Sequence, residues 1–356
     1  MFGRSRNLIG LDIGDSSVKV VELKDLGKGR GFQLLKLGWD PLSSEAIVDG
    51  AIMDSQLVTE TIQRLLQRCR IKPSAAVAAA LSGHSVIVKR ISLPVMSEAE
   101  LAESISWEAE QYIPFDIDDV NLDYEILEGS SLSGEGNMDV LLAAAKKDKI
   151  NDYVSVIEQA GLSPAIVDIA AFAMQNAFEA NYDFEPDQVI ALVDIGSSVS
   201  SISVLQGGNS VYWRDINNIG GNQYTDAIQK ELNLSADQAE QVKRGEEIDG
   251  IPFERVQPIL TAVNDDVGTE IQKTLDFFKQ ISATDGTPER LYLTGGSSQA
   301  VHLKEALSER LDTQVEMLNP FRRIPPTGRE ATPELVNEMM PSASVAVGLA
   351  LRRDPR

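Results

Sequence analysis

Residues 9–18 read Ile9-Gly10-Leu11-Asp12-Ile13-Gly14-Asp15-Ser16-Ser17-Val18, and residues 191–199 read Ala191-Leu192-Val193-Asp194-Ile195-Gly196-Ser197-Ser198-Val199. In both stretches an apolar run ends in Asp-Ile-Gly and passes into small hydroxyl residues. A second apolar run follows each of them, at 18–23 and at 201–205. This pattern predicts a β-hairpin with an acidic residue at the end of its first strand. Its repetition predicts two duplicated α/β units that face each other across a cleft.

The turns of both hairpins carry residue types that suit a phosphate. Glycine allows the backbone to approach a phosphate closely, turn amides and Ser hydroxyls donate to its oxygens, and an Asp can hold Mg²⁺ through water. One such hairpin would equally suit an ordinary turn, because Gly and Ser are common in turns. Two copies favour a nucleotide site between the two units.

Length and composition limit the classes of protein to which the chain can belong. At 356 residues it exceeds a single typical core, so two domains are expected. The 54 acidic and 32 basic residues give a formal net charge of −22, which argues against a nucleic-acid partner. The lone Cys69 excludes a disulfide framework and indicates a reducing compartment.

No stretch of the sequence predicts a signal peptide or a membrane span. The apolar run after Arg4 and Arg6 is short and is interrupted by Asp12, and no other stretch approaches the roughly 20 apolar residues that a span requires. We therefore expect a soluble, cytoplasmic protein that reaches a membrane only through a partner.

A different unit is predicted inside the first half of the chain, between about Ser85 and Gly161. Ser97 and Glu100 have the spacing of a capping box at a helix start, and Pro114 closes that helix. The order β-α-β-β-α describes a small α+β domain, residues 85–161, inserted in the first lobe. Its acidic helix is either a solvated face or a docking surface. The expected elements are strands at 86–91, 120–126 and 140–145 and helices starting near 98 and 150.

The remaining segments complete the two lobes. Apolar residues on one stripe predict a long helix from about Glu254. The other expected elements are strands at 32–39, 75–81, 209–214 and 291–294, a helix at 54–70, a Pro-rich loop at 323–341 and a closing helix at 345–351. The expected boundaries are 1–84 with 162–187 for the first lobe and 188–356 for the second, including a helical part at about 222–285.

Two glycine pairs, Gly220-Gly221 and Gly295-Gly296, each precede a predicted helix. Free amides and the positive end of the helix dipole suit a phosphate or a nucleoside packed on the backbone, although a glycine pair is also a common β-α turn. Glu240 and Lys243 share one face of a short helix, where they form either an exposed ion pair or a contact to ribose and adenine. Lys19 either faces solvent from an edge strand or neutralises a β- or γ-phosphate.

The sequence gives no support to nucleophilic catalysis. His84 and His302 are the only histidines, and neither has the spacing of a zinc site. Cys69 lies between Arg68 and Arg70 with no base in view, so no nucleophile and base are paired.

These motifs, in this order, resemble the actin-like ATPase superfamily, an α/β class with a duplicated ribonuclease H-like fold and two lobes around a nucleotide cleft. The small inserted domain, in place of the larger insertions of actin and the chaperone ATPases, narrows the resemblance to the cell-division protein FtsA and its relatives. Within that group the chain is similar to the PilM family of type IV pilus assembly proteins over essentially its whole length. The residues that carry this similarity are Leu8–Gly14, Glu108–Phe115, Leu141–Lys147, Gly161-Leu162 and Val167–Ala173.

The resemblance implies that ATP and Mg²⁺ bind between the lobes. Asp12 and Asp194 would hold Mg²⁺ through water and, with Asp168, would be the catalytic residues. Other actin-like ATPases have Glu or Gln at the start of the connecting helix to orient the attacking water, so the shorter Asp168 implies slow or absent hydrolysis. The first phosphate loop would include Gly14, Asp15, Ser16, Ser17 and Lys19, and the second Gly196, Ser197 and Ser198. The nucleoside side would be lined by Gly220, Gly221, Glu240, Lys243, Gly295, Gly296 and Ser297.

The resemblance also implies a scaffold beneath the inner membrane, whose partner is the short cytoplasmic N-terminus of a PilN-like membrane protein; other pilus assembly components are further partners. We expect that peptide in a groove between the insertion and the first lobe. Two other functions stay open. A small-molecule kinase would need a base for the substrate hydroxyl and polar substrate loops, where a compact domain stands instead. An FtsA-like division protein would carry a C-terminal membrane-binding helix, for which residues 351–356 are too short.

Overall fold

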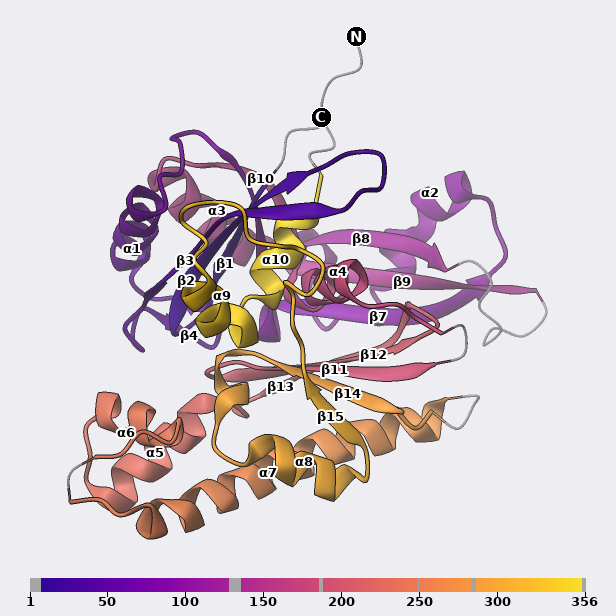
Figure 1. Cartoon of the computed structure of the whole chain (residues 1–356). Coiled ribbons are helices and arrows are strands. Elements are labelled where there is room, and N and C mark those ends of the chain that lie inside the picture. The colour runs from indigo at the N-terminus through magenta and orange to yellow at the C-terminus, as the bar shows by residue number, and fades with distance from the viewer. Residues whose placement is uncertain (1–7, 128–135, 186–187, 249, 283–285, 354–356) are drawn as a thin grey trace.

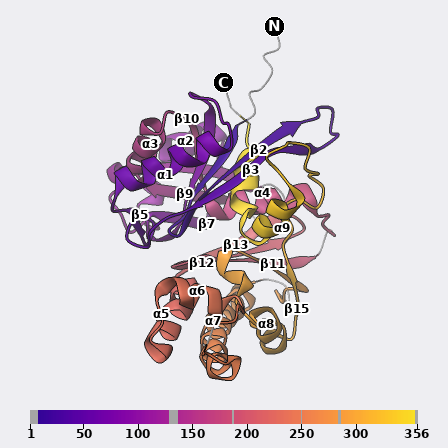
Figure 2. The ribbon, with the colours of Figure 1, turned by 60° about the vertical axis from the view of Figure 1, so that its left-hand side comes forward.

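The computed structural model describes residues 8–127, 136–185, 188–248, 250–282 and 286–353. Figures 1 and 2 show a first lobe above a second lobe, and Figure 1 shows a smaller inserted domain beside the first. Each lobe is built on a five-stranded sheet.

The sheet of the first lobe consists of β1 (Ile9–Ile13), β2 (Ser17–Asp25), β3 (Phe32–Pro41), β6 (Ala76–Leu81) and β10 (Ser163–Ile169). Its strand order is β10-β6-β1-β2-β3. β1 and β2 form the predicted antiparallel hairpin, in which Asp12 lies opposite Lys19. β6 and β10 extend the sheet in parallel orientation.

The sheet of the second lobe repeats this arrangement with β11 (Val189–Ile195), β12 (Val199–Gln206), β13 (Asn209–Asn217), β14 (Arg290–Thr294) and β15 (Gln314–Met317). Its order is β13-β12-β11-β14-β15, with an antiparallel hairpin of β11 and β12 and parallel β14 and β15. The predicted duplication is confirmed. The strands expected at 32–39 and 209–214 are β3 and β13, the third strand of each copy.

Four helices cover the first sheet: α1 (Ser55–Arg68), α3 (Lys147–Gln159), α4 (Ala170–Asn181) and α10 (Ser344–Leu351). α1 and α3 share a core with Leu11 on one face, and α4 and α10 pack on the other face. α10 crosses β1 very closely, since a Cβ atom at Gly10 would lie 1.9 Å from the carbonyl oxygen of Ala346. Any side chain at Gly10 would therefore push α10 off the sheet.

The end of the chain packs on the first lobe, although the sequence boundary of 188–356 assigns it to the second. Before α10, the N–H groups of Thr327 and Gly328 donate to Leu34 at the edge of β3, at 2.9 and 3.2 Å. The stretch predicted as a loop contains a helix, α9 (Pro333–Met339), whose N-cap Thr332 accepts from the N–H of Leu335. α10 is apolar on nearly all sides, so its sequence shows that it is buried but not against which sheet.

The second lobe carries α5 (Gly221–Leu232), α6 (Ala236–Lys243), α7 (Phe253–Ile281) and α8 (Leu303–Leu311). α7 is the predicted long helix, and its apolar stripe is buried in the core of this lobe. α7 and α8 lie below the second sheet in Figure 1, with α5 and α6 at one end. On the opposite face, α4 of the first lobe buries Met174 and Phe178 against the second sheet, so α4 packs between the lobes.

The inserted domain contains β7 (Val86–Pro94), α2 (Glu98–Ala109), β8 (Val120–Leu127) and β9 (Asn137–Lys146), with strand order β7-β9-β8. The predicted capping box of Ser97 and Glu100 opens α2, and Leu101 and Ile105 bury its inner face. α3, expected as the fifth element of this domain, instead shares the core of the first lobe with α1. The inserted unit therefore packs as β-α-β-β, because the apolar face of α3 is covered by the first sheet.

Short elements connect these parts. They are the paired strands β4 (Ile47–Val48) and β5 (Ala51–Ile52) and the 3₁₀ helices η1 (Gly83–Ser85), η2 (Ile117–Asp119), η3 (Gly296–Gln299) and η4 (Met340–Ser342). Within the described ranges, no helix combines the length and the apolar character that crossing a membrane requires.

Candidate functional site

The turns of the two predicted hairpins meet between the lobes. In each turn a glycine, Gly14 or Gly196, donates its N–H to the carbonyl oxygen three residues later at 3.0 Å, so both turns have the same hydrogen bond. The hydroxyl of Ser198 in the second turn donates to Oδ2 of Asp15 in the first. This bond joins the two lobes at the position that the repeat predicts.

The other hydroxyl residues of the turns differ in exposure. Ser16 is exposed, Ser17 is buried, and Ser197 is half-buried beside the second turn. The carbonyl oxygen of Ser16 accepts from the N–H of Leu42 at 2.9 Å, which fixes the turn against the end of β3.

Lys19 points toward the first turn rather than into solvent. Its Nζ lies 3.0 Å from Oδ2 of Asp12, and the two side chains are only 13% and 17% exposed. A Cβ atom at Gly14 would lie 3.9 Å from the same Nζ. Of the two interpretations of Lys19, the structure therefore excludes a solvent-facing side chain and leaves a cation beside the turn.

Asp194 lies in an environment that disfavours a negative charge. Burial raises the pKa of its carboxyl to about 7; Asp12 adds to the rise and Lys19 opposes it. Gly295 lies against this carboxylate with φ +94°, and a Cβ atom there would be 2.3 Å from Asp194 Oδ1. Asp12 and Asp194 are thus close enough to interact, and a cation between them would remove the repulsion.

A metal ion at this position would need ligands beyond the protein. Over the ranges that the structure describes, no group of three or more His, Cys, Asp or Glu side chains is placed to hold one. Mg²⁺ commonly keeps several waters and binds through one or two carboxylates together with phosphates. Asp12 and Asp194 fit that kind of site.

In the glycine pair Gly220-Gly221, the amide of Gly221 is not free as expected. The N–H groups of Gly221 and Asn222 donate to the carbonyl oxygens of Gly196 and Ser197 at 2.9 and 2.8 Å. A Cβ atom at Gly220 would lie 2.6 Å from Ser197 O. The pair lets the start of α5 pack directly on the second turn, and the amide of Gly221 is used in that packing.

In the pair of Glu240 and Lys243, the lysine side chain is buried and the glutamate side chain is partly exposed. Nζ of Lys243 lies 2.6 Å from Oε1 of Glu240, with the lysine side chain 5% and the glutamate side chain 39% exposed. Burial lowers the pKa of Lys243, and Glu240 opposes this change. A Cβ atom at Gly221 would lie 2.1 Å from Oγ of Ser297 and 3.0 Å from Nζ of Lys243. The structure therefore gathers the residues predicted for the nucleoside side around Gly221.

The second glycine pair leads into η3, and α8 begins only at Leu303. The N–H of Gly295 donates to Pro341 O at 2.7 Å, so it is not free for a ligand. An added Cβ atom at Gly296 would meet nothing within 4 Å, which places this residue beside open space. Gly296, not Gly295, is therefore the member of the pair that a nucleoside could approach.

Asp168 is held by an arginine that the sequence did not suggest. Nε and Nη2 of Arg352, directly after α10, donate to Oδ2 and Oδ1 of Asp168 at 2.6 and 2.9 Å. The N–H of Ile169 also donates to Oδ1 at 2.8 Å. Both carboxylate oxygens of this buried acid are thus occupied by the ion pair with Arg352 and the backbone N–H of Ile169.

Asp215 is a second interlobe contact that sequence reasoning missed. Its Oδ2 accepts from the N–H of Gly83 in the first lobe at 2.6 Å, and its Oδ1 accepts from the hydroxyl of Ser201 in the second. Burial raises the pKa of Asp215. In the sheet register, Ser201 on β12 lies opposite Asp194 on β11 and opposite Asp215 on β13. Three neighbouring strands therefore connect the cleft carboxylate with the contact between Asp215 and Gly83. The feature of the sequence that could have indicated this contact is the acidic residue Asp215 in the third strand of the second copy of the repeat.

A groove of about 1500 Å³ lies between the inserted domain and the second lobe. It runs between β7 and β13, with the end of α7 at one side, whereas the sequence led us to expect a groove against the first lobe. β7 and β13 are edge strands of their sheets. Trp213 and Asn217 are among the residues that line it, but Nε1 of Trp213 and Oδ1 of Asn217 are buried and do not face the open groove.

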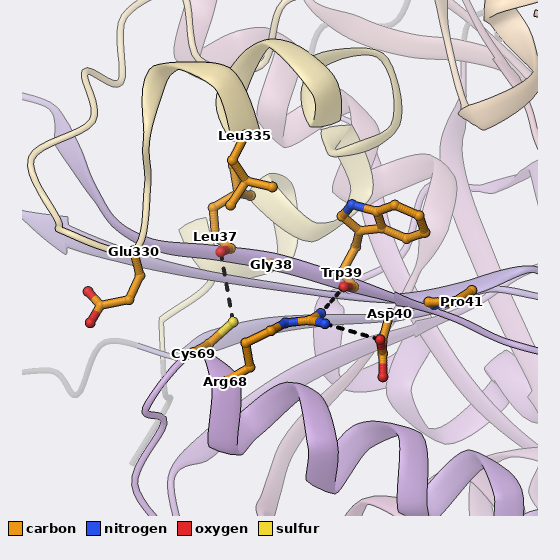
Figure 3. Close-up of a pocket in the computed structure, with 9 residues that line it drawn as sticks. All are labelled: Leu37, Gly38, Trp39, Asp40, Pro41, Arg68, Cys69, Glu330 and Leu335. Atoms are coloured by element: carbon orange, nitrogen blue, oxygen red, sulfur yellow. Dashed lines mark hydrogen bonds and ion pairs between the residues drawn. The ribbon is translucent and has the colours of Figure 1, made fainter.

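A smaller cavity of about 470 Å³ lies at the outer edge of β3, between α1 and the segment around α9 (Figure 3). Figure 3 shows Arg68 reaching across it to Trp39 and Asp40, and Cys69 below Leu37. Burial raises the pKa of the Cys69 thiol, which makes it a poor nucleophile. None of the predicted nucleotide residues lines this cavity.

Comparison with solved structures supports the same fold. The PilM-PilN type IV pilus biogenesis complex superposes with a TM-score of 0.85 and 31% sequence identity, over 98% of this chain and 99% of that chain. MreB5 of Spiroplasma citri bound to ADP superposes with a TM-score of 0.54 and 14% identity, over 96% and 94% of the two chains. The second likeness shows the actin-like fold alone.

Comparison of sequences identifies the family. FtsA of Bacillus subtilis (strain 168) is 25% identical over 261 residues, which are 66% of this chain and 57% of FtsA. The chain thus spans little more than half the length of that relative. The model of the family described as type IV pilus assembly protein PilM matches residues 10–354. Because this match covers almost the whole chain, including both hairpins and the insertion, the protein belongs to the PilM family.

Proposed function

We propose that the protein is a nucleotide-binding scaffold of the type IV pilus assembly platform. It binds ATP with Mg²⁺ between its lobes and the cytoplasmic N-terminal peptide of a PilN-like inner-membrane protein, which holds it at the membrane from the cytoplasmic side. The observation that carries the nucleotide part is the pair of facing turns with Asp12, Lys19 and Asp194. The likeness to a complex of PilM with PilN supports the partner.

The charges at the turns suit a magnesium nucleotide. Asp12 and Asp194 would hold Mg²⁺ through water, and Lys19 would neutralise a phosphate from its place beside the first turn. The bound ion would supply positive charge beside Asp194, whose ionised form is disfavoured by burial. Gly296, Ser297 and the buried pair around Lys243 would line the nucleoside side. Because Gly220 and Gly221 pack on the second turn and the amide of Gly221 is already bonded there, this pair would shape that side by close packing.

We expect hydrolysis to be slow. Asp168 is shorter than the Glu or Gln of other actin-like ATPases, and here Arg352 occupies both of its oxygens. Orienting a water would require this ion pair to open. The expected turnover is below about 1 s⁻¹, the low end of ordinary enzymes.

The groove between β7 and β13 is the proposed peptide site. An extended peptide can pair with an edge strand through its backbone while its side chains fill pockets. The floor and walls provide apolar contacts from Val211, Phe278 and Ile281.

The nucleotide site is tested by thermal melting with and without Mg-ATP. At a hundred times its dissociation constant, a ligand stabilises the folded state by about 2.7 kcal/mol. The Asp12→Ala, Asp194→Ala double variant should lose this stabilisation, whereas Asp25→Ala with Asp183→Ala, which removes two surface carboxylates, should keep it. Absence of a shift in the unmodified protein, or an equal shift in the first double variant, contradicts the proposal.

The peptide site is tested by titrating a labelled N-terminal peptide of the PilN-like protein against the full chain. Phe277→Ala removes an exposed aromatic ring that lines the groove, so affinity should fall about fivefold to tenfold. Trp107→Ala on α2 is the matched control, since Trp107 is an exposed aromatic residue, 69% exposed, that does not line the groove. If both variants bind like the unmodified protein, the peptide lies elsewhere.

A further inference from the structure

The two hairpin turns differ at one position that bears on phosphate binding. After the shared Asp-Ile-Gly, the second turn continues with Ser197, whereas the first continues with Asp15. A serine hydroxyl donates to a phosphate oxygen, but an ionised carboxylate only accepts hydrogen bonds and repels phosphate. Asp15 thus departs from the residue type that the repeat itself uses at this place.

Asp15 is also engaged with the opposite lobe. Its Oδ2 accepts from the hydroxyl of Ser198, and the N–H of Gly50 donates to the same carboxylate. Ser198 is one of the hydroxyl donors of the second turn that the phosphate site requires. The carboxylate of Asp15 therefore occupies a donor that a nucleotide would use.

We propose that Asp15 acts as an internal competitor of the nucleotide, so that its carboxylate lowers the affinity of the cleft for nucleoside di- and triphosphates. This inference rests on the proposed nucleotide site. When no nucleotide is bound, the hydrogen bond between Ser198 and Asp15 joins the two lobes. Binding of a phosphate between the turns must break this bond. Sequence reasoning grouped Asp15 with the phosphate ligands, whereas its contacts give it the opposite effect.

The surrounding charges strengthen the competition. Lys19 is already paired with Asp12 at 3.0 Å, so it does not neutralise Asp15 as well. Asp49 and Asp12 both lie near enough to raise the pKa of Asp15, a smaller cause than its burial. A phosphate therefore enters a region with an excess of carboxylates, and removal of the Asp15 charge should favour it.

The experiment is equilibrium binding of fluorescent Mg-ADP and Mg-ATP to the full chain and to two variants. Asp15→Asn keeps the shape and an acceptor for Ser198 but removes the charge, and Asp15→Ser installs the residue type of the second turn. Both should bind nucleotide at least about tenfold more tightly. Asp25→Asn is the matched control for general charge, since Asp25 pairs with Arg353 at the far end of β2 and should leave affinity unchanged.

The outcomes distinguish a failure of the Asp15 inference from a failure of the proposed nucleotide site. If the unmodified protein binds nucleotide and both Asp15 variants, folded by their melting temperatures, bind equally or more weakly, then Asp15 is a ligand or a bystander and this inference is wrong while the nucleotide site stands. If the Asp25→Asn control tightens binding as much, the effect is one of net charge and the inference also fails. If no form binds nucleotide at millimolar concentration, the proposed site and this inference both fail.

Discussion

Replacement of Asp194 by Asn is expected to stabilise the nucleotide-free protein above neutral pH. The folded state holds the proton of Asp194 up to a pKa of about 7, because burial and Asp12 disfavour the charge, whereas the unfolded chain releases it near 3.8. Between these pH values the folded state binds more protons than the unfolded state, so the free energy of unfolding falls as pH rises. The Asn variant has no such proton and escapes this loss.

The magnitude follows from the difference between the two pKa values. About three pKa units correspond to about 4 kcal/mol, an upper limit because the carboxylate is partly exposed at the cleft. The advantage of Asp194→Asn should be near zero at pH 4, grow through pH 5 and 6, and level off above pH 7. Mg-ATP should reduce the advantage, since the ion compensates the charge of Asp194.

Urea denaturation of both proteins at pH 4.5, 6, 7 and 8.5, with a chelator and without nucleotide, measures this difference. Because other groups titrate equally in the two proteins, the difference between them isolates Asp194. A variant that is less stable at pH 8.5, or an advantage that does not change with pH, would refute the assignment of Asp194 as a strained carboxylate in the cleft.

Three further predictions concern contacts around the cleft. Gly295→Ala should destabilise the fold by more than about 2 kcal/mol in urea denaturation, because φ is +94° and the new Cβ atom would lie 2.3 Å from Asp194 Oδ1; an unchanged midpoint would show that the loop can relax. Arg352→Ala should cost about 2 kcal/mol by leaving Asp168 buried without its partner, and a double-mutant cycle with Asp168→Ala should recover most of that coupling; additive losses would contradict it. Asp215→Asn leaves one acceptor for two donors, so hydrogen exchange at the Gly83 amide should accelerate at least tenfold, an effect that unchanged protection of that amide would rule out.

Local patterns were sufficient for most of the elements and for the repeat, although the helix α9 lies in a stretch predicted as a loop. The hairpins at Asp12 and Asp194, the capping box at Ser97 and the apolar stripe of α7 each depend on neighbours within a few residues. The same holds for the turn residues of the candidate site. Periodicity and turn chemistry therefore predicted the two hairpins and the strands that extend them, whereas the order of the strands in each sheet came from the structure.

Contacts between distant segments were beyond such reasoning. The apolar face of α3 indicates burial but does not distinguish the inserted domain from the first sheet, and the same is true of α10. The bonds of Asp15 to Ser198 and of Asp168 to Arg352 join residues more than 180 positions apart. A polar residue shows in the sequence that it needs a partner, but not which one the fold supplies.

The return of α10 to the first sheet makes the second lobe, in topological terms, an excursion from the first. The backbone passes from the first lobe to the second after α4 and returns to the first lobe before α9. Two connections between the lobes restrict their relative motion more than a single linker would. A truncation of the last ten residues would remove most of α10 and uncover one face of the first sheet. A label fused to the C-terminus would likewise report on the first lobe.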